Sequence, residues 1–209
     1  MKRRLIFGLV AVVLALNLIL GATVYLGSAR AMEQKDSADA NLDMFANVME
    51  KVLQEGHWIE AMACYRKTLS ISPGVAEAWA GLGMACFQNG QIKEAEETWQ
   101  KALDINPAQP QVQNNLASVL ATASDPSLRN GAKAVALAEQ ANQLTGGGNP
   151  NMLCTLAEAY AEAGRFDDAS AAARKALSQA QAQKDDKLAG ALQEQLKLYA
   201  AGSPVRRPK

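Results

Sequence analysis

Two patterns of hydrophobic and polar residues divide the chain. Between Leu5 and Leu26 the residues are uncharged and mostly apolar, with Asn17 as the one strongly polar side chain. A helix over this run would be roughly 33 Å long, enough to cross a bilayer core of ~30 Å. From about Leu42 onward, apolar residues recur at helical spacing, which predicts a series of amphipathic helices.

The N-terminal run resembles a membrane anchor in its flanking charges as well. Lys2-Arg3-Arg4 precedes it, and no acidic residue occurs before Glu33. Basic residues stay on the cytoplasmic side, so residues 1–31 predict a single-pass signal-anchor whose following domain is exported. Ala29-Arg30-Ala31 also matches the small-x-small pattern of a cleavage site. A soluble exported protein, cut near Ala31, is therefore the alternative.

An internal repeat determines the expected fold of the remaining chain. Four residues recur in similar form 34 positions later, which indicates repeated structural units. The pairs are Gly56 with Gly90, Ala61 with Ala95, Tyr65 with Trp99, and Pro73 with Pro107. Small residues allow close helix packing, glycine supplies a left-handed helix end, and proline closes a helix.

The second unit carries the fullest pattern. Its residues are Trp79, Leu82, Gly83, Gly90, Ala95, Trp99, Ala102 and Pro107. They resemble the tetratricopeptide repeat, although Cys86 stands where that family has tyrosine. The resemblance implies an all-α solenoid of stacked helical hairpins whose first helices line a concave groove. It also implies a protein that binds other proteins and carries out no catalysis.

The repeat register divides the chain into segments. We expect a linker at 32–41, about four repeats at 42–183, a capping helix at 184–201 and a basic tail at 202–209. The first repeat, about 42–74, is degenerate. The third repeat contains helices at Gln111–Ala123 and about Ala132–Leu144, separated by an inserted loop at Ser124–Gly131. The amphipathic stretch Asp185–Ala200 would cover the exposed face of the last repeat. We interpret Arg206, Arg207 and Lys209 as a solvated end, with a lipid or partner contact as the alternative.

The C-terminal half also resembles a segment found in many bacterial tetratricopeptide-repeat arrays. The likeness lies in residues 114–122, 129–132 and 144–147. It implies a bacterial origin, and with the anchor it places the repeats on the periplasmic side of a bacterial inner membrane.

Composition and motifs argue against other classes of function. The chain has 21 basic and 21 acidic residues, and its basic N-terminus leaves a mildly acidic body that does not suit nucleic acid. His57 is expected in a turn, and Cys64, Cys86 and Cys154 lack metal-binding or redox spacing. Gly146-Gly147-Gly148 has the composition of a turn and lacks a phosphate-binding motif. We therefore expect no catalytic residue, cofactor, metal or small-molecule substrate.

One candidate binding surface follows from the repeat register. In the second repeat, a stripe on the first helix would point into the groove, and the same places recur in the third repeat. The predicted partner-binding residues are Ala80, Met84, Phe87, Gln88, Asn114 and Ser118. Equivalent places hold Ala46, Glu50 and Leu53 in the first repeat and Cys154, Glu158 and Ala161 in the fourth. Such a groove, apolar at its centre and acidic at its ends, suits an apolar helix or an extended peptide.

Two functions follow from these observations. The first is a membrane-anchored scaffold that holds a partner protein in the groove and contacts the bilayer through Leu5–Leu26. The alternative is a fixed subunit of an envelope complex, whose convex face or anchor helix makes the permanent contacts. The alternative for the groove itself is that Met84 and Phe87 only pack against the neighbouring repeat or the linker. An enzymatic function is not expected from either.

Overall fold

The computed structural model describes residues 57–207. These residues fall into two units, the first ending at Lys67 and the second beginning at Thr68. Four predicted features lie outside the described residues: the anchor at Leu5–Leu26, the cleavage pattern at Ala31, the linker, and the first helix of the first repeat. None of the described helices combines the length and the apolar character that crossing a bilayer requires.

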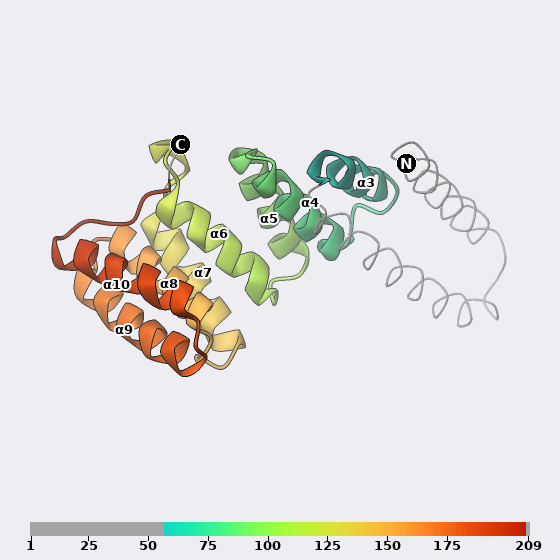
Figure 1. Cartoon of the computed structure of the whole chain (residues 1–209). Coiled ribbons are helices and arrows are strands. Elements are labelled where there is room, and N and C mark those ends of the chain that lie inside the picture. The colour runs from blue at the N-terminus through green and yellow to red at the C-terminus, as the bar shows by residue number, and fades with distance from the viewer. Residues whose placement is uncertain (1–56, 208–209) are drawn as a thin grey trace. The chain divides into compact units, whose positions relative to one another are not determined.

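The described chain is all-helical, as the sequence predicts, and no strand occurs between residues 57 and 207 (Figure 1). The α-helices are α3 (Trp58–Ile71), α4 (Ala76–Gln88), α5 (Ile92–Ile105), α6 (Pro110–Thr122), α7 (Gly131–Leu144), α8 (Pro150–Glu162), α9 (Phe166–Ala182) and α10 (Asp186–Ala200). A short 3-10 helix, η1 (Pro126–Leu128), lies within the inserted loop. Most of α3 belongs to the first unit, in which Ala61 and Tyr65 are buried.

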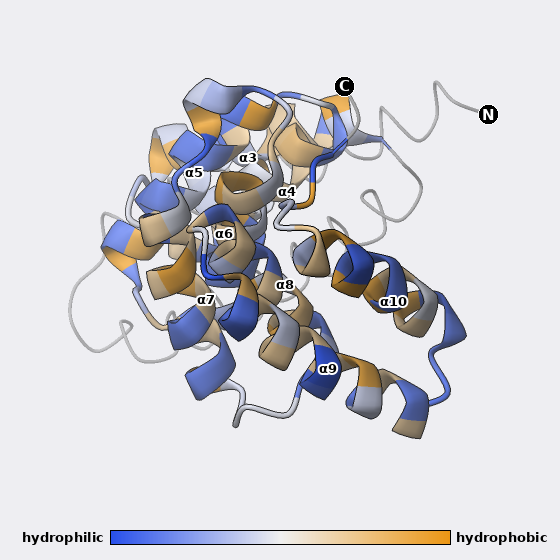
Figure 2. Cartoon of the chain, turned by 90° about the vertical axis from the view of Figure 1, so that its left-hand side faces the viewer, coloured by the Kyte–Doolittle hydropathy of each residue, from blue (hydrophilic) through white to orange (hydrophobic). Residues whose placement is uncertain are grey.

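The second unit is a stack of helical hairpins. Helix α4 packs against α5, α6 against α7, and α8 against α9, while α10 covers α9. Contacts of α5 with α6 and of α7 with α8 join successive hairpins, and the first helices α6 and α8 also touch. Each helix carries both hydrophilic and hydrophobic residues, which is the pattern of an amphipathic helix buried on one side (Figure 2). This arrangement confirms the predicted solenoid.

Glycine and polar caps determine where the helices begin and end. Gly90 and Gly164, each in the turn between two helices of a hairpin, have φ values of +80° and +76°. L-residues rarely adopt that backbone, so glycine is the residue that ends these helices at low cost. Asn130 and Asn149 cap α7 and α8 by accepting hydrogen bonds from backbone N–H groups of the first turn. Asp185 caps α10 in the same way.

Close packing of α4 on α5 depends on Gly83 and Trp99. The Trp99 side chain is 1% exposed, and its Nε1 donates a hydrogen bond to the Ala80 carbonyl at 3.2 Å. A Cβ atom on Gly83 would lie 2.5 Å from Trp99 Nε1 and 2.9 Å from Thr98 Oγ1, closer than side-chain atoms approach. The expected reason for glycine at this position, the close approach of two helices, is therefore confirmed.

The third repeat differs from its prediction by one residue at three of its four helix boundaries, while α7 ends at Leu144 as predicted. Helix α6 begins at Pro110, because proline fits the first turn of a helix, where its missing N–H is not needed. It ends at Thr122, because Ala123 adopts an extended backbone with ψ of 137°. The inserted loop contains η1, whose first turn is capped by the Asp125 side chain through the Ser127 N–H.

The C-terminal segment departs from its interpretation as a solvated end. After α10 the chain turns at Gly202, whose φ is +66°, and the Ser203 N–H bonds to the Leu198 carbonyl. Residues 203–207 then run back to the C-terminal end of α6 (Figure 1). We call residues 203–207 the tail. The interpretation is wrong for Arg206 and Arg207, because both side chains find acceptors on other helices.

Candidate functional site

The first helices of three successive repeats contribute residues to one place on the second unit. Phe87 lies at the end of α4, Ser118 and Thr122 lie one turn apart near the end of α6, and Glu158 lies in α8. Phe87 also packs against Trp99, with ring centroids 5.6 Å apart and ring planes inclined by 39°. Phe87 and Ser118 are predicted site residues, and Glu158 is the register equivalent of Ser118 in the fourth repeat.

The Arg207 side chain of the tail brings these residues together. Its guanidinium carbon lies 4.8 Å from the centre of the Phe87 ring, which is the geometry of a cation–π contact. Its Nε donates to Thr122 Oγ1 at 2.8 Å, and its Nη2 donates to Ser118 Oγ at 2.9 Å. Ser118 Oγ in turn donates to Glu158 Oε2 at 3.1 Å. We call Phe87, Ser118, Thr122 and Glu158 the guanidinium pocket.

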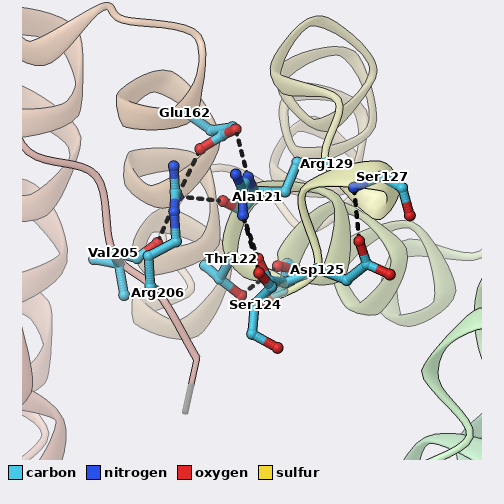
Figure 3. Close-up of polar contacts among 11 residues, drawn as sticks. Ala121, Thr122, Ser124, Asp125, Ser127, Arg129, Glu162, Val205 and Arg206 are labelled. Atoms are coloured by element: carbon cyan, nitrogen blue, oxygen red, sulfur yellow. Dashed lines mark hydrogen bonds and ion pairs between the residues drawn. The ribbon is translucent and has the colours of Figure 1, made fainter. Parts of the chain in front are cut away.

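Arg206 makes a second set of polar contacts beside this pocket (Figure 3). Its Nη1 lies 2.6 Å from Glu162 Oε2 and 3.3 Å from the Ala121 carbonyl oxygen. Arg129, from the inserted loop, approaches the other Glu162 oxygen with its Nε at 3.2 Å. The Glu162 side chain is only 13% exposed, so two arginines from distant segments compensate one sheltered carboxylate.

The end of α6 also needs these segments for its backbone acceptors. The last four carbonyls of a helix have no partner inside the helix and carry its negative dipole end. Here Leu120 accepts from the Asn130 N–H, Ala121 from Arg206, Thr122 from the Arg207 N–H and Ala123 from Arg129. The tail therefore supplies half of this cap, and the inserted loop supplies the other half.

Glu158 is the buried acid of a polar cluster that joins α6, α8 and α10. Gln195 on α10 donates to Glu158 Oε1 at 3.1 Å and also contacts Cys154 and Tyr199. Burial raises the pKa of the Glu158 carboxyl above its usual value, while the Ser118 hydrogen bond, the Arg207 charge and the Gln195 hydrogen bond act in the opposite direction. Burial and Glu158 together raise the pKa of the Cys154 thiol to about 12. Burial and the same carboxylate also raise the pKa of Tyr199.

The raised pKa of Glu158 predicts a pH dependence of stability. The folded chain holds the Glu158 proton more tightly than the unfolded chain, in which the pKa of a glutamate carboxyl is near 4.5. The resulting contribution to the free energy of unfolding is complete below pH 4.5 and is lost as pH rises through the raised pKa. We expect Glu158→Gln to remove this loss, so that its advantage over the wild type grows above pH 4.5. Urea denaturation at several pH values measures the free energy of unfolding of both proteins. If that free energy changed with pH in the same way in both, the prediction would be contradicted.

The other predicted site residues do not touch the tail in the contacts that the structure defines. Ala80 accepts the Trp99 indole hydrogen bond through its carbonyl, and Met84 Sδ lies 3.9 Å from Gln88 Nε2. Asn114 lies one turn before Ser118 on α6, and no described residue donates a hydrogen bond to its buried Oδ1. A buried acceptor without a partner is costly, and the Asn114 Oδ1 atom is closed off from the surface in this structure.

The histidine, the three cysteines and the glycine-rich turn lie in the following surroundings. His57 precedes α3, with its Nδ1 3.7 Å from Glu60 Oε1. Cys86 is buried, and Cys64 and Cys154 are half-buried. Gly146 and Gly147 both have positive φ in the turn that follows α7. No group of three potential metal ligands occurs among residues 57–207.

A cleft of about 790 Å³ borders the guanidinium pocket on the side of the second repeat. It lies between the α4–α5 turn and the end of α6, and Arg207 forms one edge of it. Its other charged lining residues are Lys93, Glu94, Glu97 and Asp125. The surface beside the pocket is therefore hollow and carries acidic groups.

The sequence pattern did not indicate Thr122, Glu162, Arg206 or Arg207 as site residues. Thr122 and Glu162 lie at helix ends, outside the stripe that the register assigned to the groove. The two arginines lie 85 to 89 positions from their partners on α6, and no periodic signal connects such distant residues. The adjacent arginines between Pro204 and Pro208 are the one local feature that marks this segment.

Comparison with known proteins supports the repeat assignment. Two family models described as tetratricopeptide repeat match residues 52–119 and residues 150–183. No curated protein sequence matches the chain.

Solved structures with the same fold include the crystal structure of MamA protein, which is 22% identical, with a TM-score of 0.56 over 75% of this chain and 82% of that one. A MamA RS-1 ArsTM double mutant is 17% identical, with a TM-score of 0.59 over 77% and 89%. A thermophilic TPR protein of Thermus thermophilus is 23% identical, with a TM-score of 0.54 over 88% and 95%. The chain therefore contains tetratricopeptide repeats.

Proposed function

We propose that the chain is a membrane-tethered scaffold that holds a partner protein in the groove along α4, α6 and α8. Tetratricopeptide repeats bind protein partners through such surfaces. The observation that carries the proposal is that Phe87 and Ser118, from two successive repeats, contact a single non-helical segment of chain, while Glu158 of the next repeat is hydrogen-bonded to Ser118. A surface built in this way suits an extended peptide, as the sequence pattern also indicates.

Further properties of the groove support partner binding. Asn114 is half-buried one turn from Ser118, and Gln88 is exposed at the end of α4. Met84 and Phe87 are half-buried, so part of each side chain is accessible. Apolar contact area with a few directional polar groups is the composition of a peptide-binding surface.

The proposed tether is the apolar run Leu5–Leu26, with the repeats on the periplasmic side of a bacterial inner membrane. Tethering would raise the local concentration of any partner that is itself attached to the membrane. Intact-mass measurement of the chain purified from membranes tests this part. A mass equal to that of the chain from Met1 supports a retained anchor. A mass equal to that of a chain starting near Met32 would show that the segment is a cleaved signal.

Charge substitutions on the groove face test partner binding. We expect Met84→Glu together with Gln88→Glu to reduce capture of a partner at least about tenfold, because two new carboxylates would face the bound segment. Phe87 is left unchanged because it also packs against Trp99. The measurement is quantitative mass spectrometry of proteins cross-linked to the chain in native membranes, with helicity checked by circular dichroism.

The matched control places the same two charges on second helices. Ala136→Glu on α7 and Ala171→Glu on α9 change exposed alanines, and we expect capture to remain at the wild-type level. Loss of capture in this control, with retention in the groove variant, would contradict groove binding. That outcome would instead favour the fixed-subunit alternative, in which the outer face makes the permanent contacts.

A further inference from the structure

The tail is bound as a peptide ligand would be. Residues 203–207 contain no helix or strand, and they are held by polar contacts, one cation–π contact and one backbone hydrogen bond to α6. No side chain of the tail is buried in the core, since Ser203, Pro204, Val205 and Arg207 are half-buried and Arg206 is exposed. Little apolar burial is therefore lost when the tail leaves the surface.

The groups beneath the tail are suited to a guanidinium. Thr122 Oγ1 and Ser118 Oγ accept hydrogen bonds from two different nitrogens of Arg207, and the carbon of the same guanidinium lies over the Phe87 ring. A planar, forked donor that also stacks on an aromatic ring is a property of arginine that lysine lacks. Behind Ser118, the Glu158 carboxylate supplies the negative charge.

The neighbouring position holds a second arginine. Glu162 Oε2 and the Ala121 carbonyl oxygen both face Arg206 Nη1. If the tail leaves, Glu158 and Glu162 lose cationic neighbours while Ala121 and Thr122 lose their donors. A segment with two adjacent arginines restores all four interactions, because the acceptors are part of the folded helices.

We propose that this surface is a binding site for an extended Arg-Arg segment of a partner protein, and that Arg206 and Arg207 of the chain's own tail occupy it until the partner displaces them. This inference rests on the proposed function, since it assigns a chemistry to the partner in the groove. The tail then acts as a built-in competitor. Its effective concentration, on the order of millimolar for a short linker, sets the affinity that a partner must exceed.

A labelled synthetic peptide tests the site directly. The probe is fluorescein-Ser-Pro-Val-Arg-Arg-Pro-Lys, and the proteins are the full chain and its Arg206→Ala, Arg207→Ala variant in mild detergent. We expect the variant to bind the probe at least about tenfold more tightly than the wild type in fluorescence anisotropy, because its site is no longer occupied in cis. Equal affinity, or no binding to the variant while its helicity is unchanged, would overturn the proposal.

A second probe separates guanidinium recognition from general attraction between opposite charges. In this probe both arginines are replaced by lysine, so the net charge is the same. We expect the variant to bind it at least about tenfold more weakly than the arginine probe, because the forked hydrogen bonds and the stacking on Phe87 are lost. Equal binding of the two probes would overturn the arginine site.

Further variants and assays distinguish a failure of the arginine site from a failure of the proposed scaffold function. Adding Ser118→Ala to the tail variant should weaken probe binding, and retention of full affinity would overturn the assigned pocket. If partner capture is the same with and without the tail arginines, the proposed competition by the tail is wrong and the proposed scaffold function is unaffected. If the variant binds the probe but the chain captures no partner, the arginine site is supported and the scaffold function is contradicted. Dimerisation through exchanged tails, measured by sedimentation, would assign the site to a second copy and overturn its assignment to a partner.

Discussion

Leu192→Ala is expected to lower the free energy of unfolding by about 2 to 5 kcal/mol. Leu192 is 0% exposed at the centre of α10, the helix that covers the last hairpin. Truncation removes apolar contacts and leaves a cavity between helices that cannot close completely. In a solenoid each unit is stabilised mainly by its neighbour, so the loss should appear first as local opening of α10.

Urea denaturation and hydrogen exchange measure this effect, and α10 supplies its own control. Leu198→Ala makes the same change at a side chain that is 41% exposed, and we expect it to alter the free energy of unfolding by no more than about 0.5 kcal/mol. Amide exchange in α10 should accelerate in the Leu192 variant and change little in the Leu198 variant. Equal destabilisation by the two substitutions would show that α10 is not packed as described.

Gly83→Ala is expected to lower the free energy of unfolding by about 1 to 3 kcal/mol, although alanine is the better helix former. The added Cβ would stand 2.5 Å from Trp99 Nε1, so α4 and α5 would have to separate or Trp99 would have to leave its position. Movement of Trp99 would also weaken its hydrogen bond to Ala80 and its contact with Phe87. Tryptophan fluorescence should therefore shift together with the denaturation midpoint.

Gly190→Ala is the matched control for this prediction. Gly190 is exposed within α10, and a Cβ added there would meet no atom within 4 Å. With no steric conflict, the lower backbone entropy of alanine should raise the free energy of unfolding by roughly 0.5 to 1 kcal/mol. The opposite signs of the two glycine substitutions distinguish helix propensity from helix packing. Stabilisation by Gly83→Ala would contradict the close approach of α4 and α5.

Helices α6, α7 and α10 could be anticipated to within one residue because their signals are local. Gly90, Asn130 and Pro110 act on the backbone next to them, and such turn, cap and first-turn effects do not depend on distant contacts. The repeat register also assigned Phe87, Ser118 and Glu158 to one stripe along the first helices, because equivalent positions in stacked hairpins lie on the same surface. In the structure Phe87 and Ser118 contact Arg207, and Glu158 accepts a hydrogen bond from Ser118. That this surface binds a partner stays a prediction.

The tail could not be anticipated, and its interpretation as solvated was the clearest error. A run of charged residues after the last helix satisfies its charges in water unless the fold offers better acceptors. Here those acceptors are helix-end carbonyls and two sheltered carboxylates, which exist only after α6 and α8 have stacked. The local sequence around Arg206 does not indicate these acceptors.

The sequence alone thus determined the all-helical repeats, the places where helices begin and end, and the need for glycine at Gly83. Each follows from steric and hydrogen-bonding preferences that act within one hairpin. Tertiary structure decided what covers the groove, because contacts between Arg207 and Ser118 join residues 89 positions apart. Those contacts depend on how successive hairpins stack, and on the low free-energy cost of closing so long a loop once the solenoid has already brought its ends together.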